Sequence, residues 1–258
     1  MRDPGLEEAI RAAGGVSELA RQLGISQPSV SNWTRIPAER VVAVESLTNV
    51  PRVVLRPDLY GTAEPADALD EVEAARAREY ALLSALLSRA PNAEMMGRLA
   101  DLRGDATPLG IAHVDLAEAA SRFDVERVER EFFNLFIGVG RSEMLPYASY
   151  YLTGFLHERP LARLREDLAA FAIERREGQA EPEDHAGILC EIMSGLIDGR
   201  LSAPAGSDQQ IFQKHLAPWL GRFFADLERA EGADFYRRVG TLGRVFVEIE
   251  TEAFSLAA

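Results

Sequence analysis

One segment of the sequence concentrates residues that could bind a cation, namely Glu181, Pro182, Glu183, Asp184 and His185. Carboxylates accept paired hydrogen bonds from guanidinium groups, so this cluster predicts a site for a ligand that carries arginine-like charge. Acidic residues also suit the first turn of a helix, and helix capping is therefore the alternative interpretation. A stripe of apolar residues at helical spacing follows, formed by Ile188, Leu189, Ile192, Met193, Leu196 and Ile197.

Aromatic residues gather in two other segments. The first contains Phe132, Phe133, Leu135 and Phe136 before Gly138, and then Pro146, Tyr147, Ser149, Tyr150 and Tyr151. The second contains Phe212, His215, Pro218, Trp219, Phe223 and Phe224, and then Phe235 and Tyr236. Loops rich in aromatic residues beside a helical core are typical of binding sites, and burial in the core is the alternative interpretation. We expect burial for Trp219.

Other reactive residue types form no catalytic or metal-binding pattern. The histidines lack the spacing of metal ligands, which argues against a metal site. Ser149 has no nucleophile elbow around it. The single cysteine, Cys190, lies on the apolar side of its predicted helix and is expected to be a small buried residue. We therefore expect a protein that is not an enzyme.

Helices are expected to position these residues throughout the chain. The segment Glu71–Ala90 is rich in helix formers and places Tyr80, Leu83, Leu86 and Leu87 on one stripe. No segment alternates apolar and polar residues as a strand would. The fold class is all-α, with too many helices for a plain four-helix bundle. Further helices are predicted over 92–102, 108–121, 124–137, 159–175, 184–198, 207–230 and 233–253.

Four shorter helices are expected near the N-terminus, over Gly5–Ala12, Ser17–Leu23, Gln27–Trp33 and 37–47. Ser17 and Ser26 are the predicted N-caps of the second and third, and Pro28 lies in a first turn. The second and third helices have the spacing of a helix-turn-helix. Short polar side chains that can read base edges lie on the third and just after it: Gln27, Ser29, Ser31 and Asn32.

Charge separates the two parts of the chain. The formal net charge is −13, yet residues 1–61 carry seven arginines and seven acidic residues. The rest of the chain therefore holds the whole negative charge, and so acidic a segment is a poor general binder of nucleic acid. DNA contact remains open only for the neutral N-terminal part. We expect a helix-turn-helix domain over 1–61, a linker over 62–69 and a second domain over 70–258. No apolar run reaches the length of a membrane span and no signal-peptide pattern is present, so a cytoplasmic protein is expected.

The N-terminal part resembles the Cro/YdaS-type helix-turn-helix family. The resemblance is carried by residues 14–33 and by the continuation through Arg35 and Arg40 to Gly61. It implies DNA binding, with contacts made by Gln27, Ser29, Ser31, Asn32 and Arg35.

The rest of the chain, over residues 70–253, resembles the TorD/DmsD family of chaperones for molybdoenzymes. Such chaperones bind the twin-arginine signal peptide of an enzyme precursor before cofactor insertion and export. The resemblance therefore implies an all-helical chaperone domain without catalysis. Four ordered elements carry it: Leu135-Phe136-Ile137-Gly138; Pro146, Ser149 and Tyr151; Glu181-Pro182-Glu183-Asp184-His185; and His215, Pro218 and Trp219.

The resemblance also implies which residues do what. The peptide groove would involve Phe132, Leu135, Phe136, Ser149, Tyr151, Glu181, Asp184 and His185. The residues with structural roles would be Gly138, Pro146, Pro182, His215, Pro218 and Trp219. No resident cofactor is implied, and weak guanine-nucleotide binding rests on the family alone.

Two further questions stay open at this level. The client could be a dimethyl sulfoxide or trimethylamine oxide reductase, a formate dehydrogenase or a nitrate reductase, and the chaperone could be a monomer or a dimer. The rival interpretation is a transcription regulator, with the helix-turn-helix on DNA and the C-terminal domain as its sensor.

Overall fold

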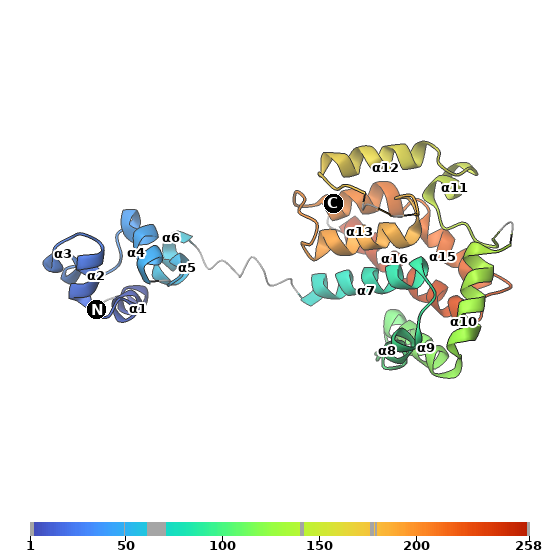
Figure 1. Cartoon of the computed structure of the whole chain (residues 1–258), viewed down its shortest axis with the longest axis horizontal. Helices are drawn as coiled ribbons and strands as arrows, with labels where there is room; N and C mark the ends of the chain where they lie inside the picture. The colour runs from blue at the N-terminus through green and yellow to red at the C-terminus, as the bar shows by residue number, and fades with distance from the viewer. Residues whose placement is uncertain are drawn as a thin grey trace. The chain divides into compact units, whose positions relative to one another are not determined.

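The computed structural model describes residues 3–48, 50–60, 71–139, 142–175, 178 and 180–256. These residues form helices joined by loops, without any strand among them, and one isolated bridge pairs Tyr147 with His185 (Figure 1). The all-α prediction is confirmed. The chain divides into two compact units, Met1–Leu69 and Asp70–Ala258. The predicted linker, 62–69, lies outside the described residues.

The N-terminal unit packs short helices around a small core that contains Leu6, Leu19, Val30, Ile36, Val44 and Leu55. Its elements are α1 (Pro4–Ala12), α2 (Val16–Gln22), α3 (Gln27–Ser31), a 3-10 turn (Ala38–Arg40), α4 (Val41–Thr48), α5 (Arg52–Leu55) and α6 (Pro57–Tyr60).

Caps explain where two of these helices begin. The hydroxyl of Ser26 accepts a hydrogen bond from the backbone N–H of Ser29, which confirms Ser26 as the N-cap of α3. The prediction for Ser17 was wrong. The N-cap of α2 is Gly15, two residues before Ser17, and its φ of 125° is accessible to glycine and strained for other residues.

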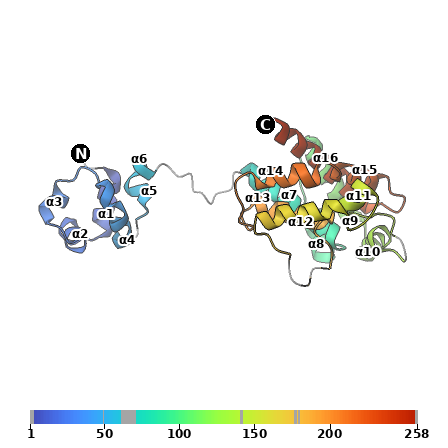
Figure 2. The same ribbon diagram turned by 90° about the horizontal axis from the view of Figure 1, so that it is seen from above.

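The C-terminal unit contains the long helices (Figures 1 and 2). Helix α7 packs along α13, and α16 packs against α15 and α9. The elements are α7 (Glu71–Ser88), α8 (Ala93–Ala100), α9 (Pro108–Arg122), α10 (Val125–Phe132), a π turn (Phe133–Ile137), α11 (Ala148–Thr153), α12 (Arg159–Ala170), α13 (Ala186–Ile197), α14 (Ser207–Ile211), a second π turn (Phe212–Leu216), α15 (Leu220–Arg229) and α16 (Phe235–Leu256).

The core of this unit is rich in aromatic side chains. The predicted stripe of α7 is buried, and so is Trp219, as expected. Cys190 is completely buried, which confirms its expected place, and burial raises the pKa of its thiol to about 12. The largest buried aromatic residues are Trp219, Tyr80, Tyr236, Phe212, Phe223, Phe224 and Phe235.

Within the described part of the chain, no helix is both long and apolar enough to cross a bilayer.

Three predicted helices differ from the observed ones. The helix expected over 124–137 is α10 followed by a π turn, which the Gly138 N–H closes by donating to the carbonyl of Phe133. The helix expected over 207–230 is broken by the second π turn and by Pro218, which has no N–H to continue a helix. The helix expected over 159–175 ends at Ala170, and Ala172 then adopts a left-handed φ of 56°.

Candidate functional site

Hydrogen bonds connect the acidic segment 181–185 to the start of α11. The N–H of Ala148 donates to the backbone carbonyl of Asp184 (3.0 Å), and the N–H of Ala186 donates to the carbonyl of Pro146 (2.7 Å). The Asp184 carboxylate accepts a hydrogen bond from the N–H of Ser149 at 2.8 Å. Asp184 and Ser149 are both buried. Asp184 therefore caps α11 from a distant segment and does not face solvent as a cation-binding group would.

His185 caps the next helix. Its Nδ1 accepts a hydrogen bond from the N–H of Gly187 at 3.1 Å, and the ring of Tyr147 packs against it with centroids 5.2 Å apart. Burial lowers the pKa of His185, against the opposing influence of the Glu181 and Asp184 carboxylates. An Nδ1 that accepts a hydrogen bond carries no proton, and the lowered pKa favours this neutral form of the imidazole.

Glu181 lies at the edge of the same segment. The hydroxyl of Tyr147 donates a hydrogen bond to its Oε2 at 2.6 Å, and burial together with this carboxylate raises the pKa of Tyr147. A cavity of about 200 Å³ adjoins the pair. Glu181 and Ser149, both predicted site residues, thus share one small cavity, whose lining is Tyr147, Ser149, Leu156, His157, Ala180, Glu181 and Pro182.

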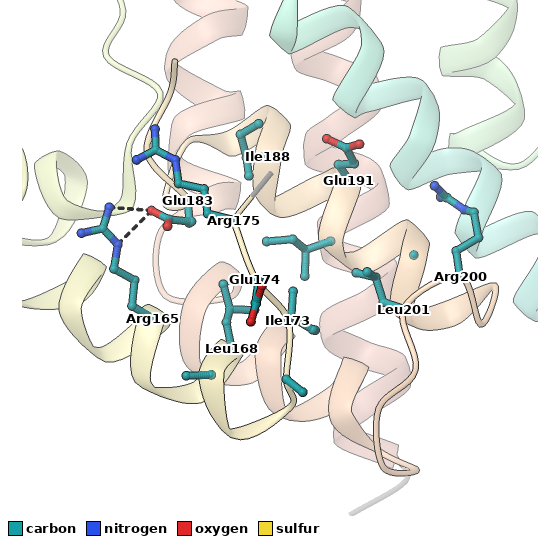
Figure 3. Close-up of a pocket in the computed structure, with 14 residues that line it drawn as sticks. Arg165, Leu168, Ile173, Glu174, Arg175, Glu183, Ile188, Glu191, Arg200 and Leu201 are labelled. Carbon is teal, nitrogen blue, oxygen red and sulfur yellow. Dashed lines mark hydrogen bonds and ion pairs between the residues drawn. The ribbon is translucent and has the colours of Figure 1, made fainter. Parts of the chain in front are cut away.

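A larger cleft opens on the other side of the segment, between α12 and α13. It encloses about 760 Å³ (Figure 3). Ile188 and Ile192 of the predicted apolar stripe line it, whereas Leu189 and Met193 point into the core. The apolar lining is completed by Leu168, Ala169, Ala172, Ile173, Gly195 and Leu201, and charged side chains surround it: Arg165, Glu174, Arg175, Glu183, Glu191 and Arg200.

Glu183 belongs to both the acidic segment and the cleft. The Nε and Nη2 groups of Arg165 donate to its Oε2 at 2.9 and 2.7 Å. Burial by itself would raise the pKa of Glu183, but these hydrogen bonds outweigh it and the pKa is lowered. Spacing in the sequence does not distinguish Glu183 from its acidic neighbours. Its role depends on α12, which packs beside it only in the folded chain.

The aromatic half of the predicted groove lies in the core. Phe132 and Phe136 pack against Tyr236, with ring centroids 5.8 and 5.3 Å from the tyrosine ring, and Leu135 is fully buried. None of the three lines the cleft or the small cavity. The structure therefore does not bring them into one open groove with Asp184 and His185. Gly138 ends their π turn with a φ of 62°.

Tyr151 and the His215–Trp219 segment support α12 and α15. The Tyr151 ring packs against Trp219 (5.4 Å between centroids), and its hydroxyl donates to Asp226 at 3.2 Å. The indole N–H of Trp219 donates to the carbonyl of His215 at 2.7 Å, and His215 Nε2 lies 2.8 Å from Asp167 on α12. The predicted structural residues thus connect the second π turn to one wall of the cleft.

The N-terminal helix-turn-helix presents its predicted residues on α3 and just after it. Gln27, Ser29, Asn32 and Arg35 are exposed, and Ser31 is half-buried. The amide of Gln27 donates to the hydroxyl of Ser31 at 2.8 Å, so part of this polar surface is paired internally.

Across the described residues of the chain, no group of three or more His, Cys, Asp or Glu side chains is arranged to hold a metal ion.

Residues 103–225 match the family model of the nitrate reductase delta subunit, and residues 6–64 match that of the bacterial toxin YdaS. Chaperone protein TorD of Vibrio cholerae serotype O1 (strain ATCC 39315 / El Tor Inaba N16961) is 27% identical over 127 residues, which is 46% of this chain and 58% of the relative. The chain thus spans less than two thirds of the length of that relative.

Chaperone protein TorD of Shewanella loihica is 24% identical over 202 residues, which cover 69% of this chain and 92% of the relative. A crystal structure described as a redox enzyme maturation protein from Archaeoglobus fulgidus aligns with a TM-score of 0.45 and 22% identity, over 67% of this chain and 93% of that one. The family models and the curated relatives confirm both predicted resemblances: the C-terminal unit is similar to the TorD chaperones, and the N-terminal unit is similar to YdaS.

Proposed function

We propose that this protein is a maturation chaperone for a molybdenum-cofactor oxidoreductase and that it binds the twin-arginine signal peptide of the precursor. One observation supports this most directly: the cleft between α12 and α13 joins an apolar floor to carboxylates at Glu174, Glu183 and Glu191 (Figure 3). A twin-arginine signal peptide combines two guanidinium groups with an apolar stretch. Burial of that stretch would supply most of the affinity, and the charges would supply selectivity.

In this proposal the apolar stretch lies over Ile188 and Ile192, and the arginines approach Glu183 at the end of the cleft, with Glu181 nearby in the same acidic segment. Three buried predicted residues, Ser149, Asp184 and His185, would then act as positioning residues, because they hold the acidic segment in place without meeting the peptide. The core packing of the unit would be the role of Phe132, Leu135, Phe136 and Tyr151.

Replacing Ile188 by serine is expected to weaken binding of a synthetic twin-arginine signal peptide about tenfold, since the loss of one apolar side-chain contact is worth about 1.4 kcal/mol. Isothermal titration calorimetry would measure the affinity, and circular dichroism would verify the fold. Ile111→Ser, on the exposed face of α9, is the matched control and should bind as the wild-type protein does. Equal affinities for the two variants would contradict the placement of the apolar stretch in the cleft.

DNA binding by the N-terminal unit is the second candidate function, with the C-terminal unit as a sensor. It is favoured by the arrangement of α2, the Ser26 cap and α3, which exposes Gln27 and Asn32. Gel-shift assays with promoter DNA from the protein's own operon should show a complex that Gln27→Ala and Asn32→Ala weaken. Gln22→Ala, on α2 before the turn, is the control. A missing shift for the wild-type protein would rule this function out for that promoter.

A further inference from the structure

Two arginine side chains of the protein itself donate hydrogen bonds to the acidic segment and to Ala180 just before it. Arg165 binds the carboxylate of Glu183 through two N–H groups, at 2.9 and 2.7 Å. The Nη2 group of Arg175 donates to the backbone carbonyls of Ala180 and Glu181, each at 3.3 Å. Both arginines line the cleft, and Figure 3 shows them on either side of Glu183. The segment 180–183 therefore receives a pair of guanidinium groups in the free protein.

These contacts are of a kind that can be exchanged. The side chain of Arg165 is 49% exposed, whereas that of Glu183 is 10% exposed. The arginine end of this pair is half exposed and regains water when it leaves, so the loss of Arg165 from this position costs little if another donor replaces it. The buried carboxylate, by contrast, cannot be left without a donor at low cost. A ligand that carries its own guanidinium group can therefore displace Arg165 and still provide a donor for Glu183.

Arg175 is also held outside regular structure. Helix α12 ends at Ala170, and the left-handed φ of 56° at Ala172 reverses the chain toward the acidic segment. Arg175 therefore lies outside any helix, and contacts with two backbone carbonyls contribute to its position. A ligand that provided the same donors would compete with it directly.

We propose that Arg165 and Arg175 are internal competitors for the paired guanidinium groups of the client and that a twin-arginine peptide binds by displacing them. This inference rests on the proposed function. Each N–H donor removed from Glu183 is replaced by one from the peptide, so the carboxylate stays paired before and after the exchange. A peptide with apolar residues but no cation would bind over the cleft floor without displacing either arginine. The two residues thereby lower the affinity for a twin-arginine peptide and leave the affinity for an uncharged peptide unchanged.

Calorimetry with three synthetic signal peptides tests this proposal: one with the two arginines, one with two lysines and one with two glutamines. The double variant Arg165→Gln/Arg175→Gln is expected to bind the arginine peptide about two- to fivefold more tightly than the wild-type protein does, since that is roughly the fold-change of one weak ion pair. The glutamine peptide should show no gain. Arg163→Gln removes one positive charge from α12 at an exposed position away from the cleft, and should leave all affinities unchanged.

The outcomes separate this inference from the proposed function. If the wild-type protein binds the arginine peptide and the double variant binds it equally or more weakly, the competition is wrong while the chaperone function stands. If neither protein binds any of the three peptides, the proposed function fails and the competition fails with it. Should the double variant lose its helical circular dichroism, Arg165→Lys replaces it. This variant keeps the charge but loses the planar fork that donates two hydrogen bonds to Glu183, so a tighter complex would support the proposal and an unchanged one would overturn it.

Discussion

Replacing Trp219 by alanine is expected to lower the free energy of unfolding of the C-terminal unit by about 3–5 kcal/mol, the usual cost of removing a large aromatic side chain from a core. Its indole packs against Tyr151 and Phe223, with centroids 5.4 and 6.0 Å away. Its N–H is the donor that holds the carbonyl of His215. Alanine would therefore leave a cavity and an unpaired carbonyl at the same place.

Urea denaturation followed by circular dichroism measures this change. Trp219→Phe is the matched control, because it keeps an aromatic ring and loses the hydrogen bond, and its expected cost is about 1–2 kcal/mol. The two units should unfold independently, so only the transition of the C-terminal unit should move. An unfolding midpoint unchanged by Trp219→Ala would show that the residue does not contribute to the core as its burial indicates.

The second large effect is expected at Glu131, at the end of α10. Its carboxylate accepts hydrogen bonds from the backbone N–H groups of Asp234, Phe235 and Tyr236, at 2.8, 3.1 and 2.7 Å. These groups begin α16, where the helix dipole also favours a negative charge. Glu131→Ala would leave the buried donors of Phe235 and Tyr236 unpaired, at a cost of about 2–5 kcal/mol.

Fluorescence can follow this unfolding because each unit contains one tryptophan, Trp33 or Trp219. In a Trp33→Phe background, the signal of Trp219 reports on the C-terminal unit alone. Glu131→Gln is the control, since its amide oxygen keeps one acceptor and should recover part of the loss. If Glu131→Ala unfolded at the wild-type urea concentration, α16 would not depend on this cap.

Periodicity predicted the long helices well because their buried faces repeat within the helix itself. The stripe of α7, with Tyr80 and Leu83, is an example. Helix α11, with six residues, is too short to show a period, and it was not predicted. Its cap comes from Asp184, 35 positions away. Such a contact depends on tertiary packing, and local sequence cannot indicate it.

Local sequence predicted where the candidate site lies, but it did not predict what each residue of the site does. The segment from Glu181 to His185 was singled out by its composition, and it does border two cavities. Its internal assignment could not be predicted, since burial decides that Asp184 and His185 cap helices while Glu183 lines the cleft. The same limit applies to Phe132, whose place beside Tyr236 depends on a helix more than a hundred residues away.

The two π turns have a consequence for how this domain tolerates change in length. Each contains one residue more than an α-helical turn would, so the side chains before and after it are offset by about 100° from a regular helix. Deleting one residue within Phe133–Ile137 or Phe212–Leu216 would restore α-helical pairing and rotate the following side chains away from their present neighbours. The spacing of the two motifs is therefore a structural constraint in its own right, separate from the identity of the residues that compose them.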